Sequence, residues 1–280
     1  MPTFSLAALT VLELAPPESV EVAARCGYAQ VGLRLLPATL GGVAYPLMGD
    51  EAMLKETIRR LSATGIAVAD LEVVVFRPET EIGVFSSFFD TAAELGAKHV
   101  LVACYDPDLV RFSDRFARFC ETAFSYGLTS DLEFMPWTAV PDLGTAARIV
   151  EEVAHPGAGV LVDALHFDRS DSCIEDLHAI PVHRLHYWQI CDGPAERPRS
   201  TEELIHAARE ERLFPGEGEI DLVRLAMAMP ADLAISVEVP TAQLAKRMDA
   251  ETRAQKALQA AKRVVEVARS KSTLGLDGRA

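Results

Sequence analysis

Residues 61–75, LSATGIAVADLEVVV, contain the unit from which the fold is predicted. A helical stretch ends at Gly65, and an apolar, valine-rich strand follows within a few residues. Glycine is common after a helix because it adopts the left-handed conformation at little steric cost. The same order recurs around Gly27, Gly96 and Gly127, so that the four glycines follow one another at intervals of 38, 31 and 31 residues. This repeat predicts parallel strands joined by helical crossovers.

The rest of the chain follows the same plan. Strands are predicted near residues 4–10, 29–35, 67–75, 98–104, 128–134, 158–163, 184–190 and 233–238. Helices are predicted near residues 17–26, 50–64, 84–95, 109–126, 142–154, 171–179, 200–210, 220–228 and 249–269. Eight such units match an α/β fold, a (β/α)₈ TIM barrel formed as a single domain by residues 1–270. Residues 271–280 are expected to form a flexible C-terminal tail. An open, doubly wound sheet is the alternative, and it is less favoured because no GxGxxG follows the first strand.

The composition argues against several classes of protein. Hydrophobic residues make up 49% of the 280 residues and charged residues 24%, which is enough for a sizeable core. The net charge of −14 argues against nucleic acid and anionic membranes, because phosphate binding needs clustered Lys and Arg. No apolar run is long enough to span a bilayer. Five scattered cysteines without a CxxC pair, and an N-terminus without a basic region, favour a cytoplasmic protein with free thiols.

Four oxygen-bearing side chains stand at the ends of four apolar, strand-like runs. They are Glu133 in LTSDLEF, Asp163 in GVLVDALHF, Gln189 in LHYWQICD and Glu238 in LAISVEV. The carboxyl ends of barrel strands meet at one mouth, so these side chains are expected to lie together. Burying them without partners is costly, and a divalent cation is the simplest common partner. Carboxylate and amide oxygens suit one Mn²⁺ or Mg²⁺ ion.

These residues resemble those of the xylose isomerase-like TIM barrel superfamily, the sugar phosphate isomerase/epimerase family. The resemblance runs from about residue 4 to residue 268. It is carried by DLEFMPW around Glu133, the Asp163-Ala-Leu-His166 segment, QICDG at 189–193, RLFPGEGEID at 212–221, and Glu238. It implies that one divalent metal ion is bound by Glu133, Asp163, Gln189 and Glu238.

Gln189 is the position where this chain departs from the family pattern. Many members carry His there, followed by the same Asp three residues later. An amide oxygen is neutral like imidazole but harder, so the change keeps the charge of the site and favours Mg²⁺ or Mn²⁺ over zinc. The additional histidines of the DNA-repair branch are missing, which also argues against nucleic acid as a partner.

The resemblance also assigns catalytic roles. In the epimerase branch, a metal-bound substrate oxygen stabilises an enediolate while two glutamates exchange a proton with the neighbouring carbon. Those roles fall on Glu133 and Glu238, which act either as ligands alone or as ligands and proton carriers. His166 lies just beyond a strand end and is expected to bond a substrate oxygen or to orient a ligand.

Four further residues are expected to bind substrate. Arg212 precedes the PGEG segment and offers a planar fork to a hydroxyl, carboxylate or phosphate group. Arg34 and Glu72 lie near strand ends, where each could touch substrate or the two could pair with each other. Trp137 follows Glu133 closely and is an aromatic wall candidate. The long loops over 36–49 and 193–219 are candidate rims of the mouth.

The leading function is a divalent-metal-dependent isomerase or epimerase acting on a small ketose or polyol through a metal-stabilised enediolate. The alternative is a lyase of the 3-dehydroshikimate dehydratase or inosose dehydratase type with the same metal site, which Gln189 mildly favours. A non-catalytic sugar-binding barrel is a third possibility. The expected partner is a small carbohydrate or cyclic polyol. An exterior helix such as 249–269 could form a homodimer, and the sequence leaves the oligomeric state open.

Overall fold

Eight parallel strands close into a barrel in the computed structural model, which describes residues 1–273. Each strand pairs with the next along the chain, and β8 closes the barrel on β1. The strands are β1 (Phe4–Leu6), β2 (Gln30–Arg34), β3 (Ala67–Phe76), β4 (His99–Cys104), β5 (Thr129–Glu133), β6 (Ala158–Asp163), β7 (Tyr187–Ile190) and β8 (Ala234–Val237). The predicted (β/α)₈ barrel is therefore confirmed.

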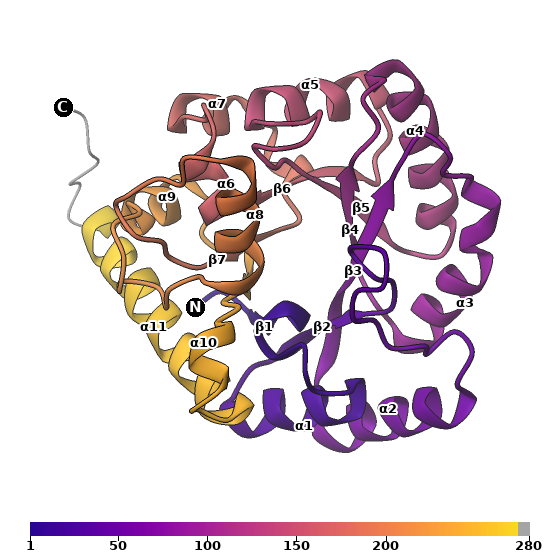
Figure 1. Ribbon diagram of the computed structural model, residues 1–280, viewed down its shortest axis with the longest axis horizontal. Helices are drawn as coiled ribbons and strands as arrows, with labels where there is room; N and C mark the ends of the chain where they lie inside the picture. The colour runs from indigo at the N-terminus through magenta and orange to yellow at the C-terminus, as the bar shows by residue number, and fades with distance from the viewer. Residues whose placement is uncertain (274–280) are drawn as a thin grey trace.

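Helices surround the strands and cover their outer faces (Figure 1). They are α1 (Pro16–Cys26), α2 (Glu51–Thr64), α3 (Ser86–Leu95), α4 (Leu109–Ser125), α5 (Leu143–Val153), α6 (Ala164–Arg169), α7 (Ile174–Ala179), α8 (Thr201–Glu210), α9 (Leu222–Ala228), α10 (Ala242–Ala245) and α11 (Ala250–Thr273). Gly65 and Gly96 end α2 and α3 in the left-handed conformation, with φ of 75° and 66°. The helix–glycine–strand repeat is thus built as the sequence predicts.

Some predicted boundaries are wrong. The strand predicted over 4–10 ends at Leu6, because the backbone N–H of Ala8 donates to Glu72 Oε1 and a 3-10 turn over Ala8–Val11 follows. The helix predicted over 171–179 starts only at Ile174, while Asp163 begins the unpredicted helix α6 by accepting two of its backbone N–H groups. Helix α11 includes residues 271–273 of the predicted tail, and the remainder of that prediction lies outside the described residues.

The core lies between the strands and the surrounding helices. Phe76 of β3, for example, packs edge-on against Phe112, Phe116 and Phe119 of α4, with ring centroids 5.4 to 6.5 Å apart. A smaller apolar cluster comprises Val73, Leu101, Ala103, Met135, Leu161 and Tyr187. Side chains alternate between the two faces of each strand, so polar residues two positions apart can point into the barrel together.

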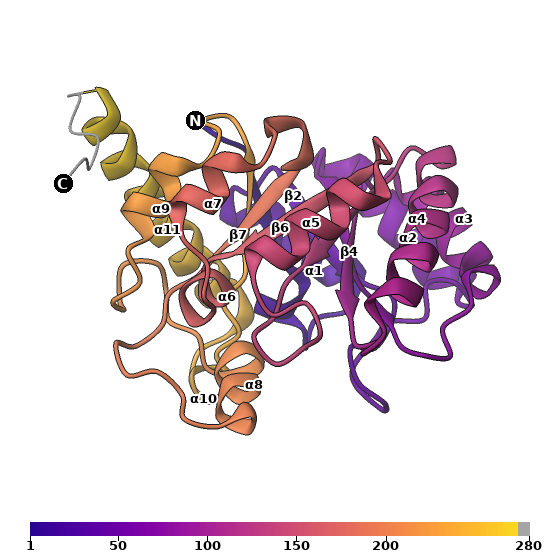
Figure 2. The same ribbon diagram turned by 90° about the horizontal axis from the view of Figure 1, so that it is seen from above.

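Both long loops lie at one end of the barrel. In Figure 2, helix α8 and the loop between β2 and α2 project from the same side of the strands, whereas the N-terminus lies on the opposite side. This side carries the carboxyl ends of the strands, where Glu133 and Asp163 are the last residues of β5 and β6. Among the helices within residues 1–273, none is long and apolar enough to cross a membrane.

Asp70 is a buried carboxyl group of β3 without a hydrogen-bond partner among the described residues. It lies against Gly32 of β2, where a Cβ atom would stand 2.9 Å from Asp70 Oδ2. Burial, reinforced by the charges of Glu72 and Glu238, raises the pKa of Asp70 well above its usual value. The folded state therefore favours the protonated form, and the stability contributed by this group is lost as pH rises towards the raised pKa.

We expect Asp70→Asn to stabilise the protein at pH 8 by roughly 1–3 kcal/mol, because the amide cannot ionise. At pH 5 a larger fraction of Asp70 is protonated in the folded state, so the gain should be smaller. Thermal or urea unfolding at both pH values measures the difference, with the exposed Asp171→Asn as control. An equal effect of Asp70→Asn at the two pH values would contradict the assigned ionisation.

Candidate active site and metal centre

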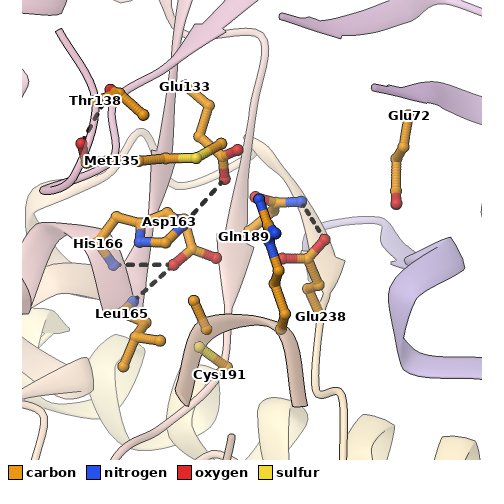
Figure 3. Close-up of polar contacts among 12 residues, drawn as sticks. Glu72, Glu133, Met135, Thr138, Asp163, Leu165, His166, Gln189, Cys191 and Glu238 are labelled. Carbon is orange, nitrogen blue, oxygen red and sulfur yellow. Dashed lines mark hydrogen bonds and ion pairs between the residues drawn. The ribbon is translucent and has the colours of Figure 1, made fainter. Parts of the chain in front are cut away.

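Four predicted ligands meet at the mouth of the barrel. Glu133 and Asp163 end β5 and β6, Gln189 lies in β7, and Glu238 follows β8 directly. Strand register places Asp163 directly beside Gln189. One carboxylate oxygen from each of Glu133, Asp163 and Glu238 lies within 4.8 Å of the others, and all four side chains are buried. Figure 3 shows them grouped together, with Glu72 apart from the group.

Gln189 has one satisfied and one unsatisfied polar atom. Its Nε2 donates a hydrogen bond to Glu238 Oε1 at 3.0 Å. Its Oε1 is buried and has no hydrogen-bond partner within residues 1–273. A buried oxygen without a partner costs free energy, so the site offers one acceptor that the protein leaves available.

Arg212 connects two of the carboxylates. Its Nη1 donates to Asp163 Oδ2 at 2.6 Å, and its Nη2 lies 3.0 Å from Glu238 Oε2. Its Nε donates to the carbonyl oxygen of Ala208, and this hydrogen bond fixes the orientation of the guanidinium group. Burial lowers the pKa of Arg212, but the two carboxylates and Cys191 outweigh burial and raise it well above its usual value. Arg212 is therefore a permanent cation inside the site.

The carboxyl groups differ in their protonation. Burial raises the pKa of Asp163, but Arg212 and His166 outweigh it and lower the pKa overall. Burial raises the pKa of Glu133 well above its usual range, and nearby Glu238 and Asp163 add to the shift. Burial likewise raises the pKa of Glu238 to about 8. Asp163 is thus a carboxylate, whereas the two glutamates hold protons readily when no other cation compensates them.

His166 lies beside Glu133 at the start of α6. Its Nε2 is 3.7 Å from Glu133 Oε1, and its ring packs edge-on against Trp137 with centroids 5.1 Å apart. Burial lowers the pKa of His166 to about 4, so the imidazole is neutral near pH 7. Its Nδ1 is buried without a hydrogen-bond partner in the part of the chain described.

Arg34 and Glu72 pair with each other. Arg34 Nη2 lies 2.6 Å from Glu72 Oε2, and Glu72 Oε1 accepts the N–H of Ala8. Arg34 lines the cavity above the ligands, whereas Glu72 is not among the lining residues. The sequence left open whether each residue touches substrate or the two pair with each other, and in the structure they pair.

A cavity of about 240 Å³ opens above the carboxylates. Its floor and walls include all but three of the predicted site residues; Glu72, Asp163 and Gln189 are not among its lining residues. Both long loops contribute to the rim as predicted. The lining residues from the first are Ala38, Thr39, Gly42 and Val43, and those from the second are Ala208, Arg209, Glu210 and Arg212. The space suits a small molecule enclosed on several sides.

Tyr105 and Arg209 are polar residues of the cavity that were not predicted as site residues. Tyr105 OH accepts hydrogen bonds from Trp137 Nε1 at 2.9 Å and from Arg209 Nη2 at 3.0 Å. Tyr105 directly follows β4, and that position could have marked it as a mouth residue. Arg209 lies on α8, far from any strand end, and no sequence signal points to it.

Asp192 holds the segment that follows Arg212. Its Oδ1 accepts the backbone N–H groups of Gly193 and Ile220, and its Oδ2 accepts those of Gly216 and Gly218. A side chain at position 218 would overlap Asp192, which explains the glycine there. This segment, and with it the position of Arg212, is therefore fixed by one buried carboxylate.

Comparison with known proteins gives matches at three levels. The family model described as a xylose isomerase-like TIM barrel matches residues 20–264. An inosose isomerase of Halalkalibacterium halodurans is 26% identical over 148 residues. That match covers 49% of this chain and 50% of the enzyme, so the chain matches only about half the length of this curated relative.

Two solved structures illustrate the likeness of the fold. A crystal structure of IOLI protein with a bound zinc atom gives a TM-score of 0.81 at 23% identity, covering 94% of this chain and 98% of that one. A D-psicose 3-epimerase from Clostridium cellulolyticum H10 gives 0.71 at 13% identity, covering 94% and 99%. At these identities the structures support the fold alone. Since the family model covers most of the chain and the eight strands close as that model requires, the chain belongs to the xylose isomerase-like TIM barrel family.

Proposed function

We propose that the protein is a divalent-metal-dependent isomerase or epimerase of a small ketose or cyclic polyol. The observation that carries the proposal is the set of four oxygen donors at the base of an open cavity, with Gln189 Oε1 left unpartnered among the described residues. The activities by which two similar proteins are named, an inosose isomerase and a D-psicose 3-epimerase, support a sugar-type substrate.

The charges of the site fit a divalent cation. The carboxylates of Glu133, Asp163 and Glu238 face a single guanidinium, that of Arg212, which leaves two negative charges when all are ionised. Asp163 uses three of about four lone-pair positions, two for backbone N–H groups and one for Arg212, and so retains one. Glu133, Asp163, Gln189 and Glu238 would hold the ion, and their oxygens favour Mn²⁺ or Mg²⁺. When bound, the ion would supply electrostatic stabilisation for negative charge on a substrate oxygen.

Glu133 and Glu238 are the proposed proton carriers. Both line the cavity, and they enter it from strands separated by β6 and β7. One carboxylate would take the proton from the carbon beside the substrate carbonyl, and the other would return a proton to that carbon or to its neighbour. The raised pKa of each glutamate suits a group that must hold a proton between these two events.

Other lining residues would position the substrate. Arg34 is fixed by Glu72, and its Nε is buried without a partner among residues 1–273. His166 offers its unpartnered Nδ1 to a hydroxyl group. Trp137 supplies an apolar wall, held by its hydrogen bond to Tyr105. Arg212 acts on the substrate through the two carboxylates that it orients.

A dehydratase remains the second candidate, and Arg209 is the observation that favours it. This arginine lines the cavity, and in the described chain no carboxylate forms an ion pair with it. A substrate carboxylate, as in 3-dehydroshikimate, could bind there. The same pair of glutamates would then remove a proton beside the carbonyl while water leaves from the next carbon.

A substrate panel separates these functions. Ketoses, inososes and 3-dehydroshikimate would be incubated with the protein and Mn²⁺ in D₂O and followed by NMR. The proposed isomerase is expected to place deuterium on the carbon beside the carbonyl without loss of water. Loss of water would identify the dehydratase. Sugar binding without turnover or bound metal would identify a non-catalytic barrel.

The variants Glu133→Gln and Glu238→Gln test the proton carriers. Each is expected to lower kcat by at least about 100-fold, because an amide cannot accept the proton. Mn²⁺ binding measured in parallel separates loss of a ligand from loss of a base. Glu151→Gln, an exposed site on α5, is the matched control. Near-native turnover in either site variant would exclude the two-carboxylate mechanism.

The variant Gln189→His tests the preference for a hard ion. Imidazole nitrogen replaces an amide oxygen at similar charge, so competition between Zn²⁺ and Mn²⁺ should shift towards zinc, by roughly tenfold or more. Equilibrium dialysis with both metals measures the ratio. Gln243→His, on the surface helix α10, is the control. An unchanged ratio would mean that Gln189 does not ligate.

The variant Arg212→Ala tests the charge balance. Without metal it leaves the buried carboxylate of Asp163 without its partner and raises the pKa of Glu238 further, and it should cost about 3–5 kcal/mol of stability. Mn²⁺ should recover part of this loss, because the ion supplies positive charge to the same carboxylates. Urea unfolding in EDTA and in Mn²⁺ measures both values. A loss that is equal under the two conditions would argue against a metal ion between these groups.

A further inference from the structure

Two histidines and an aspartate meet at the end of the barrel opposite the cavity. His99 is the first residue of β4, Asp131 lies in the middle of β5, and His186 directly precedes β7. Ligand atoms of these three residues lie within 4.8 Å of one another. We refer to His99, Asp131 and His186 as the His–Asp cluster. None of its members contributes to the cavity above the glutamates.

Both imidazoles are directed at the same carboxylate. His186 Nδ1 lies 2.5 Å from Asp131 Oδ1, and His99 Nδ1 lies 3.8 Å from Asp131 Oδ2. The two rings are nearly parallel, with centroids 5.9 Å apart. Thr129 Oγ1 is 2.7 Å from both His99 Nδ1 and Asp131 Oδ2, so it holds the first histidine against the carboxylate. Two nitrogens and two oxygens thus converge on one small volume.

A glycine makes this convergence possible. Strand β6 lies between β5 and β7, so a side chain on β6 would separate Asp131 from His186. The residue at that point is Gly159, where a Cβ atom would overlap Asp131 Oδ1 and stand 2.5 Å from His186 Nδ1. The sheet is therefore built to let residues of non-adjacent strands touch.

The protonation and exposure of the cluster suit a metal ion. Asp131 is almost fully buried at 1% side-chain exposure, whereas His99 and His186 are 19% and 16% exposed and give access from solvent. Burial lowers the pKa of His99, and the charges of His186 and Lys98 add to this against the opposing charge of Asp131, which favours the neutral imidazole that binds metals. Burial and Arg184 oppose the protonation of His186, but Asp131 outweighs them and raises its pKa, so a proton competes there.

We propose that the His–Asp cluster is a second metal site, one that takes a borderline transition-metal ion such as Zn²⁺. Two imidazole nitrogens and one carboxylate oxygen are a ligand set typical of Zn²⁺, Ni²⁺ or Cu²⁺ and unlike the oxygen-only set at the mouth. The ion would displace the proton shared by His186 and Asp131. Thr129 would remain as the hydrogen-bond partner that orients the ligands. This inference does not depend on the proposed enzymatic function.

Metal stoichiometry at pH 8 tests the second site. The wild-type protein is expected to bind one more equivalent of Zn²⁺ in equilibrium dialysis than the His186→Gln or His99→Gln variant. The exposed His178→Gln is the matched control and should match the wild type. Asp163→Asn should remove only the equivalent at the mouth, so failure of one site is distinguishable from failure of the other.

Cu²⁺ spectroscopy provides a second readout. The four predicted ligands at the mouth offer only oxygen, but His166 lies beside them, so nitrogen hyperfine coupling in the electron paramagnetic resonance spectrum is assigned to the His–Asp cluster only if it persists in the His166→Gln variant. Coupling that disappears in the folded His99→Gln variant supports the site. Absence of coupling in the wild type, or Zn²⁺ binding unchanged in both histidine variants, would overturn the proposal.

Discussion

The contact between one buried guanidinium and two buried carboxylates organises the mouth of this barrel. Arg212 reaches Asp163 and Glu238 at once, and its side chain is buried. Burying like charges together is unfavourable, and the guanidinium offsets part of this cost. Backbone hydrogen bonds hold the chain on both sides of this contact. Asp163 accepts N–H groups at the start of α6, and Asp192 accepts N–H groups of the segment after Arg212.

Much of the fold could be predicted because barrel strands carry strong local signals. The spacing of Gly65 and Gly96 reveals the repeat, and several strands lie in apolar runs, such as HVLVAC in β4 and AGVLVD in β6. The meeting of the acidic side chains at the mouth was also predictable, since residues such as Glu133 and Asp163 stand at strand ends, which all meet at one edge.

Contacts between distant segments could not be predicted in the same way. The chain leaves the strand after Leu6 because the backbone N–H of Ala8 donates a hydrogen bond to Glu72, which is 64 residues away in the sequence. The sequence predicts that Arg212 binds substrate, but in the structure its guanidinium pairs with the carboxylates of Asp163 and Glu238. The histidines of the His–Asp cluster carry no spacing motif, and they meet only because the closed sheet brings β4, β5 and β7 to one place. Loop residues such as Arg209 are placed by the path of α8, which no local pattern determines.

Strand β5 has an unusual consequence for how this sequence can vary over evolutionary time. Thr129, Asp131 and Glu133 occupy every second position of this strand. Thr129 and Asp131 make contacts at the end of the barrel that holds the His–Asp cluster, whereas Glu133 lies with the carboxylates at the mouth. A slip of a single residue would remove both sets of contacts together. Substitutions in the rim loops can therefore change the cavity alone, whereas an insertion or deletion in this five-residue segment would disturb both ends of the barrel.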